Sequence, residues 1–160
     1  MAKALIALGV QSHEVVCIIG FNAPEWMMAN LGSITVGGIA AGIYTTNSPT
    51  ACQYIAKHSS ARVVVCENIA QLVKFLVPTP DGPNTDNEVL AYVVYGEDLS
   101  ACATSPHATL LRRTPNIYSW IGFLQLGVGV DETALDARIR TITPGKPTTS
   151  PQKNSVLAPA

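Results

Sequence analysis

Short, uninterrupted apolar runs recur along the first hundred residues and constrain the fold more than any other feature of this sequence. They occupy residues 15–19, 63–66 and 90–95, and a fourth, at residues 39–45, follows a pair of glycines. A strand with apolar residues at every position must be covered on both faces, as in a parallel sheet flanked by helices. Helix-like segments separate the runs, so the pattern predicts an α/β fold in which βαβ units form part of a parallel sheet.

Two helix starts that contain proline support this prediction. Pro24 follows Asn22 and Ala23, either of which can cap a helix, and Ser48 precedes Pro49. Proline suits the first position of a helix because its missing N–H would have no partner there. We expect helices over residues 2–8, 24–36, 49–59, 69–77, 118–126 and 131–140.

Side-chain orientations can be predicted for two of these helices. In the helix that begins at Pro49, one face collects the apolar and small residues, so we expect Gln53 and Lys57 to point outward as an i, i+4 pair. In the helix over residues 24–36, Trp26, Met27 and Met28 are interpreted as residues that face the core.

The remaining segments are rich in proline and turn-forming residues. Residues 78–87 have the composition of a proline-rich loop, and residues 99–115 form a second, weakly patterned stretch; we expect both segments to be exposed at the surface. Residues 141–160 combine proline with glycine, serine and threonine, which predicts a disordered tail. The expected organisation is therefore a partial domain over residues 1–140 followed by a tail over residues 141–160.

The charge balance disfavours two classes of partner. Ten Lys and Arg face eleven Asp and Glu, which leaves a formal charge of −1, so we expect no nucleic-acid partner and no electrostatic attachment to an anionic membrane. The uncharged residues 26–44 approach the length of a membrane span. Polar residues within them and the glycines near their end favour a buried helix followed by a strand. No secretory signal opens the chain, so we expect a cytoplasmic protein.

Neither metal binding nor nucleophilic catalysis is predicted. Cys17, Cys52, Cys66 and Cys102 lie far apart in the sequence, without the close pairs that zinc sites and dithiol motifs use. We expect them to be reduced packing residues. The three histidines have no serine, cysteine or carboxylate at a recognised catalytic spacing, so no catalytic residue is assigned.

Two turns that follow predicted strands are candidates for ligand binding. They span residues 20–24 and 44–49, and α/β sheets bind ligands beyond the carboxyl ends of their strands. The second turn offers hydroxyl and amide groups at Thr45, Thr46 and Asn47, with a plain capped turn as the alternative interpretation. The glycines between residues 37 and 42 precede a strand, so they do not match a phosphate-binding loop.

Several strings in the sequence resemble bubblegum-type long-chain and very-long-chain fatty acyl-CoA synthetases of the adenylate-forming, AMP-binding superfamily. The strings are GFNAPEW at residues 20–26, GGIAAGIYTTNSP at residues 37–49, VVVCEN at residues 63–68 and NIYSW at residues 116–120. The resemblance covers residues 1–78 well and residues 88–140 in patches. It departs from the family at Thr50, where an acidic residue is usual.

The resemblance implies the N-terminal part of an enzyme that joins a fatty acid to AMP and then transfers the acyl group to coenzyme A. It implies ATP, Mg²⁺ and CoA as the family's cofactors, and a cytoplasmic location with peripheral attachment to the endoplasmic reticulum or other membranes. In relatives, the turn that matches residues 44–49 lies near the CoA site. The resemblance therefore places Thr45, Thr46 and Asn47 in the CoA region.

The family's Thr-Ser-Gly-Thr-Thr-Gly phosphate loop is expected shortly after residue 140, where this sequence reads differently. We therefore expect a fragment of a long-chain fatty acid–CoA ligase that is inactive alone, and we assign to it no bound cofactor of its own. The alternative is a non-catalytic α/β module that binds CoA, a nucleotide or a protein partner. An incomplete sheet would leave apolar surface open, so self-association is also expected.

Overall fold

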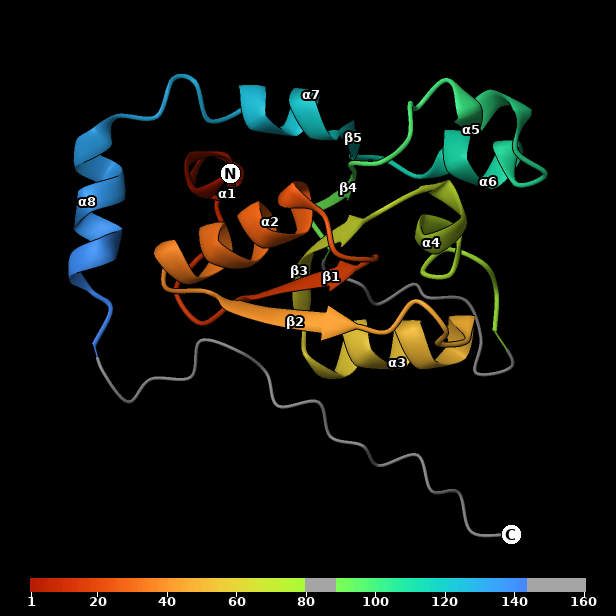
Figure 1. The fold of residues 1–160 in the computed structure, drawn as a ribbon, viewed down its shortest axis with the longest axis horizontal. Helices are drawn as coiled ribbons and strands as arrows, with labels where there is room; N and C mark the ends of the chain where they lie inside the picture. The colour runs from red at the N-terminus through yellow and green to blue at the C-terminus, as the bar shows by residue number, and fades with distance from the viewer. Residues whose placement is uncertain (80–88, 144–160) are drawn as a thin grey trace, which may run out of the picture.

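A single parallel sheet organises this computed structural model, which describes residues 1–79 and 89–143 (Figure 1). The described strands lie in the spatial order β2-β1-β3-β4-β5, and all neighbours are parallel. They are β1 (Val15–Ile19), β2 (Ile39–Ile43), β3 (Ala61–Cys66), β4 (Ala91–Val94) and β5 (Ile117–Ser119). The predicted α/β class and parallel sheet are confirmed.

Helices cover both faces of the sheet and create two cores. Alternate residues of each strand point to opposite faces, so Val16 and Ile18 pack into one core while Cys17 and Ile19 pack into the other. The first core lies under α1 (Ala2–Leu8), α2 (Pro24–Thr35) and α7 (Trp120–Gln125). The second lies under α3 (Pro49–His58), α4 (Ile69–Val73) and α6 (Ala108–Arg113).

Local capping chemistry explains where several of the helices begin. The side chain of Ser48 accepts a hydrogen bond from the Ala51 N–H (3.2 Å) at the start of α3, and Asn68 caps α4 in the same way. Ala23, rather than Asn22, occupies the cap position of α2, directly before Pro24. Gly9 ends α1 in the left-handed conformation, with φ at 91°.

Two segments differ from the prediction. Residues 99–115 contain α5 (Ala101–Thr104) and α6, and the predicted helix over residues 118–126 begins instead as the edge strand β5. Leu111 provides the reason in the first case, because it is buried against the sheet although its surroundings in the sequence are polar. In the second case Tyr92 donates its N–H to the Asn116 carbonyl (2.9 Å), a pairing that depends on β4.

Three side-chain orientations also differ from the prediction. Met27 and Met28 are 51% and 42% exposed, so they do not face the core, whereas Trp26 is partly buried. The outward orientation of Gln53 is wrong, because only 7% of the residue is exposed. Its amide nitrogen donates to the carbonyls of Lys74 (3.0 Å) and Val77 (2.7 Å), which satisfies a polar group inside the protein.

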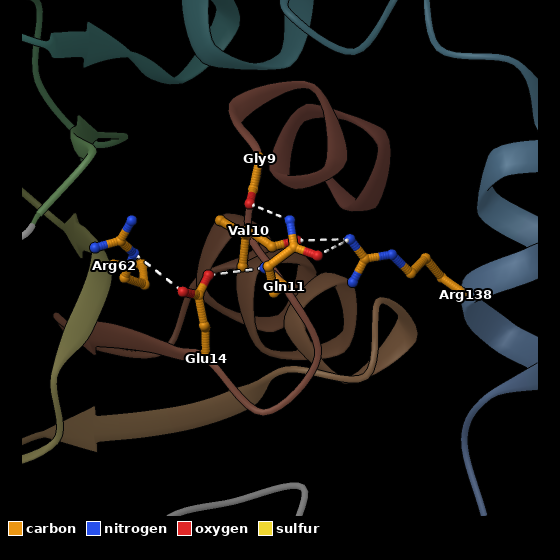
Figure 2. Close-up of polar contacts among 6 residues, drawn as sticks. All are labelled: Gly9, Val10, Gln11, Glu14, Arg62 and Arg138. Atoms are coloured by element: carbon orange, nitrogen blue, oxygen red, sulfur yellow. Dashed lines mark hydrogen bonds and ion pairs between the residues drawn. The ribbon is translucent and has the colours of Figure 1, made fainter.

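Helix α8 (Glu132–Arg140) is attached by polar contacts (Figure 2). Arg138 donates to the Val10 carbonyl and to the side-chain oxygen of Gln11, both at 3.1 Å. The Gln11 backbone N–H in turn donates to Glu14, whose carboxylate pairs with Arg62 at 3.2 Å. Since no residue of α8 is buried, these contacts hold it beside the loop between α1 and β1.

Within the described ranges, no helix is long and apolar enough to cross a membrane, and residues 26–44 form most of α2 followed by β2. Most of the predicted proline-rich loop at residues 78–87 and of the predicted tail at residues 141–160 lies outside the described residues.

Candidate functional site

The two turns singled out in the sequence meet at one small cavity. Its volume is about 320 Å³, and it lies beyond the carboxyl ends of the neighbouring strands β1 and β2. The first turn and the start of α2 contribute Gly20, Phe21, Asn22 and Trp26, and the end of β2 and the second turn contribute Gly42, Ile43, Tyr44 and Thr45. Parallel strands end at the same edge of a sheet, which is why two turns 20 residues apart share one site.

Thr45, Thr46 and Asn47 belong to one β-turn that begins at Tyr44, and of these three residues only Thr45 lines this cavity. Thr45 is half-buried and lines it, whereas Thr46 is exposed and Asn47 is half-buried beside it. The Asn47 N–H donates to the Tyr44 carbonyl at 3.1 Å, which closes the turn. The Thr45 carbonyl accepts a 2.6 Å hydrogen bond from the ammonium group of Lys74.

Aromatic side chains dominate the remaining walls. Phe21 and Tyr44 are 69% and 64% exposed, respectively. Trp26 packs over Gly42, where a Cβ atom would lie 3.6 Å from the indole ring. Large apolar walls beside a few neutral hydrogen-bonding groups suit a ligand that carries both methylene and amide groups.

The turn at residues 20–22 is fixed by hydrogen bonds with the side chains of Glu67 and Tyr95. The Glu67 carboxylate accepts the Phe21 N–H (3.2 Å), and the Tyr95 hydroxyl donates to the Phe21 carbonyl (3.3 Å). Only glycine fits at position 20, because a Cβ atom there would lie 2.0 Å from the Tyr95 oxygen. Burial, followed by the nearby Glu67 charge, raises the pKa of Tyr95 to about 12, so the hydroxyl keeps its proton at neutral pH.

Glu67 and Tyr95 also occupy the crevice between the ends of β1 and β3. In a sheet with the order 2-1-3-4-5, this crevice is the usual ligand site, since the chain turns in opposite directions on its two sides. Their hydrogen bonds with Phe21 place both side chains at this crevice, whereas the cavity lined by Thr45 lies at the ends of β1 and β2. Glu67 directly follows β3, a position at which the sequence already suggests a binding residue, and the place of Tyr95 directly after β4 is the signal by which sequence reasoning could have found it as well.

A larger cavity of about 710 Å³ lies beyond the ends of β3 and β4. Its lining includes Asn68, Glu97, Ser105 and His107, and the Glu97 carboxylate accepts the Ile69 N–H at 2.8 Å. The sequence did not predict this cavity because part of its wall comes from residues 99–115, whose weak pattern predicted no helix there. Its single carboxylate already has a backbone partner, so the lining does not indicate one class of ligand.

The cysteines offer no activated thiolate. Cys17, Cys52 and Cys66 are buried and, like Cys102, are free thiols, as predicted. Burial raises the pKa of Cys17 to about 12 and that of Cys52 to about 11, although the Lys74 charge opposes the second shift. Among the described residues, no group of three or more His, Cys, Asp or Glu side chains could hold a metal ion.

Comparison with known proteins identifies relatives of most of the chain. It is 37% identical over 145 residues to the long-chain-fatty-acid–CoA ligase ACSBG2 of Xenopus laevis, a match that covers 91% of this chain and 18% of that protein. The human ligase ACSBG1 is 38% identical over 145 residues, with the same coverage of both proteins. The chain thus spans about a fifth of the length of these curated relatives.

Solved structures of related enzymes share the fold. The anthranilate CoA ligase AuaEII in complex with anthranoyl-AMP superposes with a TM-score of 0.50 at 27% identity, over 61% of this chain and 18% of that one. The A domain of carboxylic acid reductase from Segniliparus rugosus gives a TM-score of 0.56 at 12% identity, over 93% of this chain and 23% of that one. The family model of the AMP-binding enzymes matches residues 1–120, and this chain belongs to that family.

Proposed function

We propose that this chain is an N-terminal part of a long-chain fatty acid–CoA ligase and that it contributes the turn at residues 44–47 to the binding of CoA. In such a reaction a carboxylate attacks the α-phosphate of ATP to give acyl-AMP and pyrophosphate, and the CoA thiol then displaces AMP. The observation that carries the proposal is the 37% identity to long-chain-fatty-acid–CoA ligases over 91% of the chain. The turn beside an open cavity supports the assignment to CoA.

The residues at this cavity fit CoA better than they fit ATP with Mg²⁺. CoA carries a thiol on an arm of methylene and amide groups. The aromatic walls and the neutral donors of the turn suit that arm. ATP with Mg²⁺ requires a phosphate cradle and acidic ligands, whereas the 160 residues contain no glycine-rich phosphate loop and the described ones form no acidic cluster. We derive no step through ATP from this chain.

The first test is enzymatic. We expect the 160-residue chain to form no acyl-CoA from ATP, palmitate and CoA, because stabilising the transferring phosphoryl charge requires preorganised donors that these residues do not supply. A full-length relative such as the human ligase serves as the positive control. Acyl-CoA formed by the isolated chain at a rate above an ATP-free blank would overturn this part of the proposal.

The second test is CoA binding by the chain itself, and it also addresses the alternative function of a non-catalytic binding module. Saturating CoA at 100 times its Kd would stabilise the fold by about 2.7 kcal/mol, which raises Tm by about 5–10 °C for a domain of this size. Asn47→Pro removes the N–H that closes the turn and should abolish the shift. Thr133→Pro, on the remote α8, is the matched control. A shift with AMP but not with CoA would favour a nucleotide-binding module.

We also propose that the isolated chain self-associates and that, in cells, it is cytoplasmic with peripheral attachment to membranes. The exposed side chains of Met27, Met28 and Leu31 lie on α2, and no charged residue occurs between positions 26 and 56. Such an uncharged apolar surface favours association. Light scattering should show a mass above 16.9 kDa that falls to the monomer value in Leu31→Lys. A monomer at every concentration would contradict self-association.

A further inference from the structure

The side chain of Lys74 connects the end of α4 to the turn at residues 44–47. Lys74 follows the last residue of α4, and its ammonium group donates to the Thr45 carbonyl at 2.6 Å. The side chain is half-buried, and no carboxylate among the described residues lies within ion-pair distance of it. The Lys74 carbonyl is itself fixed, because it accepts a hydrogen bond from the buried Gln53 amide (3.0 Å).

The hydrogen bond from Lys74 is made to the central peptide of the turn, whose orientation differs between turn types. In the β-turn from Tyr44 to Asn47, the central peptide joins Thr45 to Thr46. A half-rotation of this peptide converts a type I turn into a type II turn, which requires a positive φ at the third residue. Thr46 keeps a negative φ. The ammonium group thus holds the orientation that a β-branched residue at position 46 also prefers.

Holding the Thr45 carbonyl also determines where the next N–H points. A trans peptide is planar, with its C=O and N–H directed to opposite sides. Since the Thr45 carbonyl faces Lys74, the Thr46 N–H faces away from Lys74. No described residue accepts this N–H, and Thr46 is exposed. The donor is therefore presented to solvent beside the cavity that Thr45 lines.

We propose that Lys74 is a positioning residue that locks the central peptide of this turn and presents the Thr46 N–H to an acceptor oxygen of CoA. The proposal rests on the proposed function for its ligand, but the locking of the turn is independent of it. Lys74 touches no ligand in this scheme. It acts through the orientation of one peptide, and an apolar side chain of similar length cannot replace it, because such a side chain has no donor.

The decisive experiment compares three variants of the 160-residue chain by NMR. In Lys74→Met, which keeps the length of the side chain, we expect amide exchange at Asn47 to rise about tenfold, the factor that corresponds to the loss of one ordinary hydrogen bond. We also expect the Thr46 amide resonance to move. Lys74→Arg keeps the charge and a donor and should restore both values. Lys3→Met removes a positive charge from an exposed pair with Glu132 and should change neither.

Binding measurements identify which part of the ligand the Thr46 N–H meets. Lys74→Met should weaken CoA binding about tenfold, with recovery in Lys74→Arg. Pantetheine, which lacks phosphate, should show the same loss if the acceptor is an amide carbonyl, whereas adenosine 3′,5′-bisphosphate should show it if the acceptor is a phosphate oxygen. Equal CoA affinity in the wild type and Lys74→Met would overturn the inference and leave the proposed function intact.

Two further outcomes separate the proposals. Absence of CoA binding by the wild type would reject the ligand, and with it the proposed function, while the Asn47 exchange rate would still decide whether Lys74 locks the turn. Unchanged Asn47 exchange in Lys74→Met would reject the lock. If Lys74→Met fails to fold, the test is made on the wild-type chain. A hydrogen bond from Lys74 produces a scalar coupling between its Nζ and the Thr45 carbonyl carbon, which NMR can measure. Absence of that coupling would contradict the inference.

Discussion

Replacing Gln53 with methionine tests a buried polar contact that joins α3 to the segment after α4. The glutamine is 7% exposed, and its amide nitrogen donates to the carbonyls of Lys74 and Val77 at 3.0 and 2.7 Å. Methionine has nearly the same shape but no donor. The substitution therefore leaves two carbonyl groups without this partner while it changes the packing little.

The size of the effect follows from these two acceptors. A buried polar group that loses its partner costs about 1–3 kcal/mol, so two carbonyls give about 2–4 kcal/mol after allowance for their contact with water at the edge of the core. In a domain of this size each kcal/mol lowers Tm by about 2–4 °C. We therefore expect Gln53→Met to lower Tm by about 4–16 °C.

Urea denaturation followed by circular dichroism measures this loss directly. The control is Lys57→Met, one turn later on the exposed side of α3, which should change the free energy of unfolding by less than about 1 kcal/mol, because interactions of exposed charged side chains contribute little. The sequence pattern predicted the same outward orientation for both residues, so the pair separates the two interpretations. Equal stabilities of the two variants would refute the buried role of Gln53.

Four other perturbations have defined outcomes. Arg138→Met should increase hydrogen exchange in α8 while the sheet amides stay protected, because Arg138 supplies the contacts to Val10 and Gln11; unchanged exchange would contradict the polar attachment. Gly127→Ala should lower Tm, since the new Cβ would lie 2.6 Å from a backbone nitrogen of α1, and an unchanged Tm would contradict that contact. A thiol reagent at pH 8 should label Cys102 alone in the folded chain and all four cysteines in urea. The free energy of unfolding should fall above about pH 9. The folded state raises the pKa of Cys52 to about 11 and that of Cys17 to about 12, so these thiols lose their protons first in the unfolded state. A constant free energy of unfolding up to pH 11 would contradict this.

The strands and the main helices could be predicted because their signals are local. A run such as Val63 to Cys66 needs cover on both faces wherever it occurs, and Ser48 caps α3 with an N–H only three residues away. The two candidate turns were chosen by a general rule about parallel strands, and in the structure Phe21 and Thr45 from these turns line one cavity. In each case the information lies within a few residues or in the order of elements.

Contacts that join distant segments depended on the tertiary structure. Gln53 looked like a surface residue because its acceptors lie more than 20 positions away on a segment that packs beside α3. The three residues of β5 became a strand only because β4 offered them a partner.

The sequence by itself determined a parallel α/β sheet, the starts of its main helices, and membership of an enzyme family through strings such as GFNAPEW. Only the tertiary structure decided that Glu67 and Tyr95 form hydrogen bonds with the turn at Phe21 and that Lys74 reaches the turn at Thr45. Hydrophobic periodicity and capping act over a few residues of chain, and the sequence displays them directly. A long polar side chain finds its partner only after the layers have packed, because that packing sets which carbonyl or amide lies within hydrogen-bond distance.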